Sequence, residues 1–174
     1  MKTLAITLFL ALASFSSGGE RKADSIKATD DFRKSVASAK KVIVYEGLPH
    51  QMFEGELLQK ESQRPDVLKI SSYPFYTPAT PAKNQDHLRK LLADPKSVIA
   101  LRGEKRCGGF HPDYSISWTS GSKTYYALIC FGCHEVIFLE GKRQFRYDLT
   151  EEAYDAFKED LSSYASKRPH RDKG

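Results

Sequence analysis

The 174-residue chain lacks any apolar run after its N-terminal one that is long enough to cross a bilayer. It also lacks a glycine-rich phosphate-binding loop, an internal repeat and a flexible linker. The lack of a further apolar run argues against a membrane-spanning helix in the body of the chain. The lack of a glycine-rich loop argues against a nucleotide-binding motif. Since a chain of this length with no linker favours one folded unit, we expect a single domain.

The N-terminus has the pattern of a secretory signal peptide. Lys2 is followed by an apolar run from Leu4 to Ala13 and then by small residues. The run is about half of the roughly 20 residues that span a bilayer, which favours cleavage over anchoring. No cysteine follows it, so we expect no lipid attachment. We predict a signal peptide over residues 1–18, cleaved between 13 and 20, and an exported protein, periplasmic or extracellular, that is soluble after cleavage.

The formal net charge is +5 and the isoelectric point is about 9.0. The positive excess is spread along the chain, apart from a basic tail over residues 167–174, which we expect to be disordered. Because an exported protein does not normally meet nucleic acid, we do not expect the positive charge to serve nucleic-acid binding. The partner is unknown from the sequence, and another protein of the cell envelope is the class that fits export.

Hydrophobic patterning predicts an α+β fold for residues 25–166. Strands are expected at 42–47, 66–71, 113–118, 123–131, 134–140 and 143–149, and helices at 29–41, 49–62, 84–94 and 150–165. The proline-rich segment 73–83 is expected to be loop. The last four strands follow one another closely, so we predict an antiparallel meander of about four strands packed against helices on one face.

Three cysteines, Cys107, Cys130 and Cys133, are the most informative feature of the chain. Export places them in an oxidising compartment, where thiols tend to pair. Because three is odd, either one bridge forms and one thiol remains, or all three serve something other than bridging.

Cys130 and Cys133 stand in the stretch "ICFGCHE", which is Cys-x-x-Cys followed by His134. On an unbroken strand the two cysteines would point to opposite faces. Gly132 favours a two-residue hairpin loop, which would instead place the two cysteines opposite one another. We therefore expect a tight hairpin with a usable pair of thiols.

The same stretch matches the attachment pattern of c-type haem, in which Cys130 and Cys133 form thioethers and His134 binds iron. Its β-rich surroundings weigh against this interpretation, as does the lack of a methionine after the motif to serve as distal ligand. A thioredoxin-like role is disfavoured because strand formers, not a helix, follow the motif. Haem c stays as an alternative cofactor.

Cys107 and His111 precede the first strand of the meander, and the predicted pairing carries them to the end of the sheet that holds Cys130 and Cys133. Cys107 can then bridge to either cysteine, which is our first expectation, with no cofactor. Alternatively, three thiolates and a histidine, His111 or His134, complete a tetrahedral zinc site. Both uses are left open by the spacing.

The phrases "VYEGLPH", "CGGFHPDY" and "ICFGCHE" resemble those of uncharacterised exported bacterial proteins that carry a lone cysteine followed by a Cys-Phe-x-Cys segment. The resemblance covers residues 42–165 and places Cys107, Cys130 and Cys133 in the shared motif. It does not extend to His134, because the residue after that segment varies in those proteins. The resemblance implies no activity.

No catalytic constellation stands out. Cys107 with His111 and Asp113 has the residue types of a nucleophile and base, but no oxyanion site accompanies them. We therefore expect a non-catalytic structural or interaction domain with a cysteine cluster. A c-type haem protein is the first alternative, and a zinc-stabilised binding module is the second.

Overall fold

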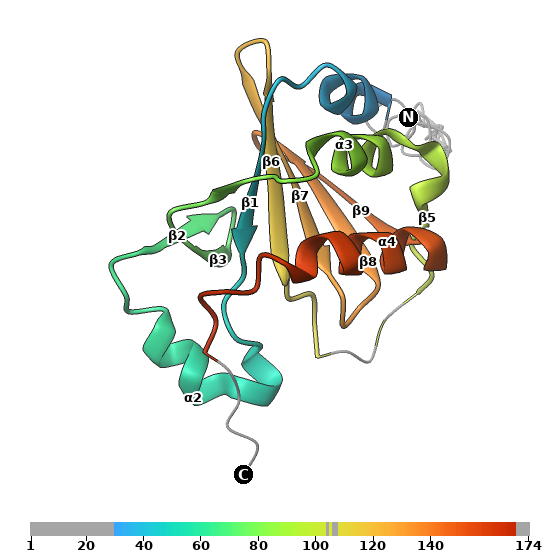
Figure 1. Cartoon of the computed structure of the whole chain (residues 1–174). Helices are drawn as coiled ribbons and strands as arrows, with labels where there is room; N and C mark the ends of the chain where they lie inside the picture. The colour runs from blue at the N-terminus through green and yellow to red at the C-terminus, as the bar shows by residue number, and fades with distance from the viewer. Residues whose placement is uncertain (1–29, 104, 106–107, 170–174) are drawn as a thin grey trace, which may run out of the picture.

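A computed structural model describes residues 30–103, 105 and 108–169 of the chain (Figure 1). The predicted signal peptide and Cys107 therefore lie outside the described residues. None of the described helices is long and apolar enough to cross a membrane.

The fold is α+β, as predicted, with one large antiparallel sheet. The sheet has seven strands in the order β4-β1-β6-β7-β8-β9-β5, and the segments predicted to form the meander lie within it. Its strands are β1 (Val42–Glu46), β4 (Thr80–Pro81), β5 (Val98–Ala100), β6 (Tyr114–Ser120), β7 (Lys123–Cys130), β8 (Glu135–Glu140) and β9 (Arg143–Leu149). A separate hairpin is formed by β2 (Val67–Ile70) and β3 (Tyr73–Tyr76).

The helices are one over residues 30–37, α2 (Gln51–Glu61), α3 (Gln85–Ala93) and α4 (Glu151–Ser162), with a short 3₁₀ turn η1 (Pro95–Ser97). Figure 1 shows α3 and α4 lying over the sheet, whereas α2 lies apart from them near the C-terminal segment. Helix α4 begins where the sequence predicted, because the Thr150 hydroxyl accepts a hydrogen bond from the Ala153 N–H at 3.3 Å.

Two apolar clusters occupy the two faces of the sheet. The larger one packs the helix over 30–37, α3 and α4 against residues such as Ile116, Trp118 and Phe138. The smaller one packs the β2–β3 hairpin against Leu128 and Ile137 on the opposite face. Because both faces are covered, β8 is apolar from Val136 to Leu139 instead of alternating with polar residues.

Segment 73–83 was predicted to be loop, and this was wrong for residues 73–76 and 80–81. Tyr73–Tyr76 pairs with β2, and Thr80–Pro81 pairs with β1 at the edge of the large sheet. Pro74 and Pro81 are tolerated because they lie in short pairings at the edges of their sheets. Strand β5, which pairs with β9, was not anticipated, because three residues after a 3₁₀ turn carry too little pattern.

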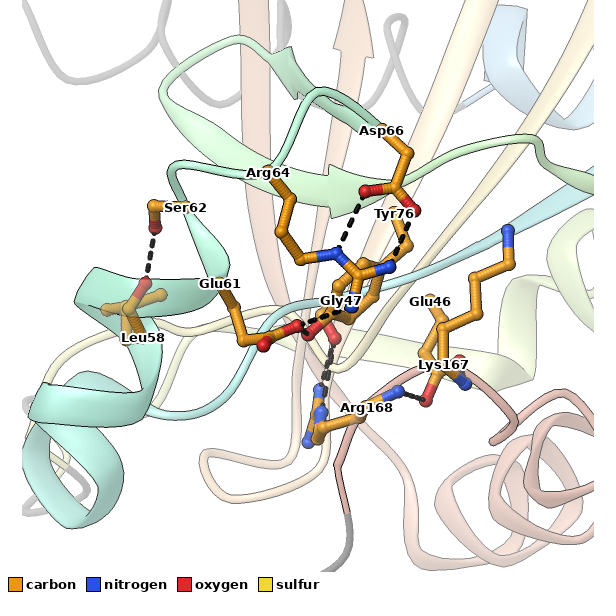
Figure 2. Close-up of polar contacts among 10 residues, drawn as sticks. All are labelled: Glu46, Gly47, Leu58, Glu61, Ser62, Arg64, Asp66, Tyr76, Lys167 and Arg168. Atoms are coloured by element: carbon orange, nitrogen blue, oxygen red, sulfur yellow. Dashed lines mark hydrogen bonds and ion pairs between the residues drawn. The ribbon is translucent and has the colours of Figure 1, made fainter.

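The first residues of the predicted tail are held in place. Buried Glu46 accepts backbone hydrogen bonds from Ser166, Lys167 and Arg168 at 2.8–3.1 Å. The Arg168 guanidinium donates to the carbonyl oxygen of Gly47 at 2.9 and 3.1 Å (Figure 2). The domain therefore extends past 166, because a buried carboxylate on β1 requires hydrogen-bond donors and this segment supplies them.

A second polar network attaches α2 to the β2–β3 hairpin beside this segment (Figure 2). Arg64 pairs with Glu61 at 3.0 Å and with Asp66 at 2.8 Å, and its guanidinium carbon lies 5.3 Å from the ring centre of Tyr76. The Tyr76 hydroxyl donates to the buried Glu61 carboxylate at 2.8 Å. Through Glu61, this second network fixes the C-terminal end of α2 to the hairpin.

Candidate functional site

The turn between β7 and β8 is the centre of the predicted cysteine site. Cys130 pairs with Glu135, not with Cys133, so the connection has four residues, 131–134. The expected two-residue hairpin is therefore wrong. The positive φ of the turn, 56°, falls on His134 and not on Gly132, since the chain enters β8 one residue after His134.

His134 points toward the start of α4. Its ring stacks on Tyr154 with centroids 3.8 Å apart and planes inclined by 12°. Its Nδ1 lies 3.9 Å from a carboxylate oxygen of Glu151, and its carbonyl accepts a hydrogen bond from the Leu149 N–H at 2.8 Å. The turn and the first turn of α4 thus fix the orientation of His134.

Cys130 is a free thiol in the interior, with 1% of its surface exposed. Burial raises the pKa of Cys130 to about 11, and hydrogen bonds with the backbone of His111 and Cys133 act in the opposite direction. A thiol in this state is neutral at physiological pH and is a poor nucleophile.

Cys133 is also buried, and its Sγ lies 3.5 Å from the carbonyl oxygen of Gly109. Gly109 follows Cys107 by two residues. The loop that contains Cys107 therefore passes directly beside Cys133, although Cys107 itself lies outside the described residues.

His111, the possible additional ligand, is at the same end of the sheet, as predicted. Its Nε2 lies 2.7 Å from the carbonyl oxygen of Leu48, and its ring centre lies 4.7 Å from that of His50. Burial lowers the pKa of His111. The structure thus brings the backbone of His111 to Cys130, while the ring of His111 faces the start of α2.

A row of acidic residues shares the sheet face of Cys130, and the sequence analysis missed it. Glu135 pairs with Cys130 on one side and with Asp148 on the other, so all three side chains lie on one face. Glu135 and Asp148 are 0% and 3% exposed. Side chains alternate along β8, so Glu135 lies on the same face as Ile137 and Leu139. This alternation in the sequence could have predicted that the carboxylate is buried.

Cations neutralise this row. Arg146 pairs with Glu135 through its Nε at 2.7 Å, and Phe110 lies over the Arg146 guanidinium, 5.4 Å from ring centre to guanidinium carbon. The Lys105 ammonium lies 3.1 Å from the Asp148 carboxylate. One carboxylate oxygen of Glu135 has no hydrogen-bond partner among the described residues.

A hollow of about 620 Å³ opens beside the cysteine turn. Phe53 of α2 and Ile99 of β5 line it together with the turn, and the polar groups in its wall include His50, Arg102, Lys105, His134, Asp148 and Glu151. Phe53 is 63% exposed, and neighbouring Met52 is 58% exposed. The hollow combines an exposed aromatic ring with charges of both signs.

No group of three or more His, Cys, Asp or Glu side chains within the described ranges is arranged to hold a metal ion. Cys107 is outside those ranges, so the zinc arrangement that includes it stays a prediction. The haem arrangement likewise stays a prediction.

Comparison with known proteins found no matching family, no similar curated protein and no similar solved structure. The site must therefore be interpreted from its own geometry.

Proposed function

We propose that this chain is an exported, non-catalytic interaction domain of the cell envelope. In this proposal a Cys107–Cys133 disulfide fastens the loop before β6 to the cysteine end of the sheet. The 3.5 Å approach of the Cys133 Sγ to Gly109 carries the pairing, because a residue two positions from Gly109 is within reach of that sulfur.

The free state of Cys130 supports the same assignment. With Cys130 buried and unpaired, Cys107 and Cys133 are the two cysteines that remain for one bridge. Such a bridge closes a loop of about 25 residues, and in the chain-entropy model it is worth roughly 3 kcal/mol. The bridge would also hold the loop that carries Phe110 over the sheet face on which Glu135 and Asp148 are buried.

The interaction role rests on the surface next to this bridge. The exposed side chain of Phe53 lines the 620 Å³ hollow, and exposed apolar groups beside a hollow are typical of binding surfaces. The neutral, buried thiol of Cys130 gives no support to nucleophilic catalysis.

One preparation tests the assignment against the haem and zinc alternatives. The exported protein is purified without reductant, denatured, treated with iodoacetamide and weighed intact. We expect a mass two hydrogens below that of the reduced chain before alkylation, and one alkylated thiol, on Cys130, after it. A visible Soret band with a mass increase equal to haem would instead establish the haem protein. Bound zinc and three reactive thiols would establish the zinc module.

Matched variants separate the bridge from the rest of the proposal. Cys107→Ser and Cys133→Ser should each leave two reactive thiols in the denatured chain, and Cys130→Ser should leave none. If Cys130→Ser instead leaves two reactive thiols, the proposed pairing is wrong.

A further inference from the structure

A second hollow, of about 920 Å³, lies at the opposite end of the sheet, away from the cysteines. It is bordered by the tip of the β2–β3 hairpin, by the start of β7 and by the turn between β8 and β9. It contains no residue of the cysteine turn or of the 620 Å³ hollow, so it is independent of the proposed function.

Cations predominate in its wall. Lys123, Lys142 and Arg143 line the hollow, and the one carboxylate among them, Glu140, is bonded to both Lys123 and Arg143. Lys142 is exposed and has no ion pair or hydrogen bond with another described residue. The hollow therefore has a surplus of positive charge and one ammonium group ready for an anion.

The remaining lining combines a small apolar floor with hydrogen-bonding groups. Ile70 and Leu139 are 5% exposed each and form the floor. The hydroxyls of Ser71 and Thr124 and the amide of Gln144 belong to exposed residues at the rim. A ligand that fits must therefore present apolar C–H surface and hydroxyl groups as well as negative charge.

Tyr126 joins the floor to the rim. It is half-buried, and its hydroxyl has no hydrogen-bond partner among the described side chains and backbone groups. Burial, with a contribution from neighbouring Tyr45, raises the pKa of Tyr126. The hydroxyl is therefore neutral and is able both to donate and to accept a hydrogen bond with a ligand.

We propose that this hollow binds an acidic sugar chain, with a carboxylate on Lys142, sugar hydroxyls on the rim and a sugar C–H face on Tyr126 and Leu139. A lipid tail would stay largely exposed, because the floor offers few apolar side chains. A small inorganic anion would meet exposed side chains without a converging set of backbone N–H groups. A sugar acid matches both the polar rim and the apolar floor.

The test uses the full exported chain with tetragalacturonate as probe and the uncharged tetrasaccharide maltotetraose as comparison. Binding is followed by amide chemical shifts and by calorimetry at two salt concentrations. We expect tetragalacturonate to shift the amides of Thr124, Tyr126 and Gln144, to bind more weakly at high salt, and to bind more tightly than maltotetraose.

Two variants sharpen the test. Lys142→Gln should weaken tetragalacturonate binding by about two- to fivefold, the loss expected for one exposed charge contact. Lys158→Gln, which removes an exposed charge on α4 that does not line the hollow, should leave the affinity unchanged. Tyr126→Phe should weaken binding while the folded chain keeps its thermal midpoint within a few degrees. The absence of amide shifts, equal affinity for the neutral tetrasaccharide, or equal effects of the two lysine variants would each overturn the proposal.

Discussion

Cys130 and Glu135 are directly opposite one another across β7 and β8. This pairing leaves four residues in the turn and places a buried thiol beside a buried carboxylate on one face of the sheet. It also separates the roles of the two cysteines of the Cys-x-x-Cys motif. Cys130 belongs to the sheet interior, whereas Cys133 lies against the loop that precedes β6.

The burial of Cys130 predicts low reactivity in the folded protein. At pH 8 we expect iodoacetamide to leave Cys130 unmodified until the chain is unfolded, because the thiol is 1% exposed and its pKa is raised to about 11. Mass spectrometry of samples alkylated with and without guanidinium measures this. Rapid alkylation of the native chain would show that the thiol is accessible.

The same thiol predicts a loss of stability in alkaline solution. Its pKa is about 11 in the folded chain against an ordinary value of 9.0, so the unfolded chain releases the proton first as pH rises. The stabilising contribution is therefore complete below pH 9 and declines up to pH 11. We expect the free energy of unfolding to fall by about 2 to 3 kcal/mol from this group over that range.

Urea unfolding at several pH values, with Cys130→Ala as the matched variant, isolates this effect. The variant is less stable at neutral pH because it leaves a small void. Its stability should nevertheless decline less steeply between pH 9 and 11. Burial also raises the pKa of Tyr114, from 10.0 to about 12, so this group adds a decline that begins near pH 10, but it is present in both proteins and cancels in their comparison. Parallel pH curves for the two proteins would contradict the prediction.

Gly47 is predicted to be intolerant of any side chain. A Cβ atom at this position would lie 2.1 Å from the carbonyl oxygen of Pro112, because the Gly47 N–H donates to the Asp113 carbonyl at 2.7 Å and draws the two segments together. We expect Gly47→Ala to lower the free energy of unfolding by about 1 to 3 kcal/mol, as overpacked backbone does.

Gly55→Ala is the control for Gly47→Ala, since a Cβ atom there meets nothing within 4 Å. Helix propensity predicts that this variant is neutral or more stable by up to about 1 kcal/mol. The midpoint of thermal unfolding should therefore fall in Gly47→Ala and stay unchanged or rise in Gly55→Ala. Equal midpoints would show that the segments carrying Gly47 and Pro112 adapt freely.

Glu46 is predicted to hold the C-terminal segment. Glu46→Gln keeps the size of the side chain but removes the charge that accepts three backbone hydrogen bonds. Since hydrogen bonds to charged groups are worth about 1.5 to 3 kcal/mol, we expect the segment to open more often. Trypsin should then cleave after Lys167 faster than in the parent chain, as measured by mass spectrometry.

Glu56→Gln, on the exposed surface of α2, is the matched control for this digestion. It should leave the rate of cleavage after Lys167 unchanged. If Glu46→Gln and Glu56→Gln are cut at the same rate, the carboxylate of Glu46 does not secure the segment.

The chain's local patterns were sufficient for most of the elements. The alternation of Tyr114, Ile116 and Trp118 against serines predicted β6, and Thr150 with the apolar stripe of the following helix predicted α4. These features depend on residues close together along the chain, so they can be predicted from the sequence alone. The same patterns indicated an α+β domain, and they brought His111 to the end of the sheet that holds the cysteines.

Tertiary structure decided what local patterns could not express. Pro74 and Pro81 were predicted to lie in a loop, yet they lie in strands because β2 and the more distant β1 offer pairing edges. The register of β7 on β8 separated Cys130 from Cys133, and the burial of Glu46 required donors that residues 166–168 supply from the far end of the chain. The sequence determined which segments are able to form strands and helices and which residues carry thiols. Long-range pairing and the need to satisfy buried charge decided which of them meet.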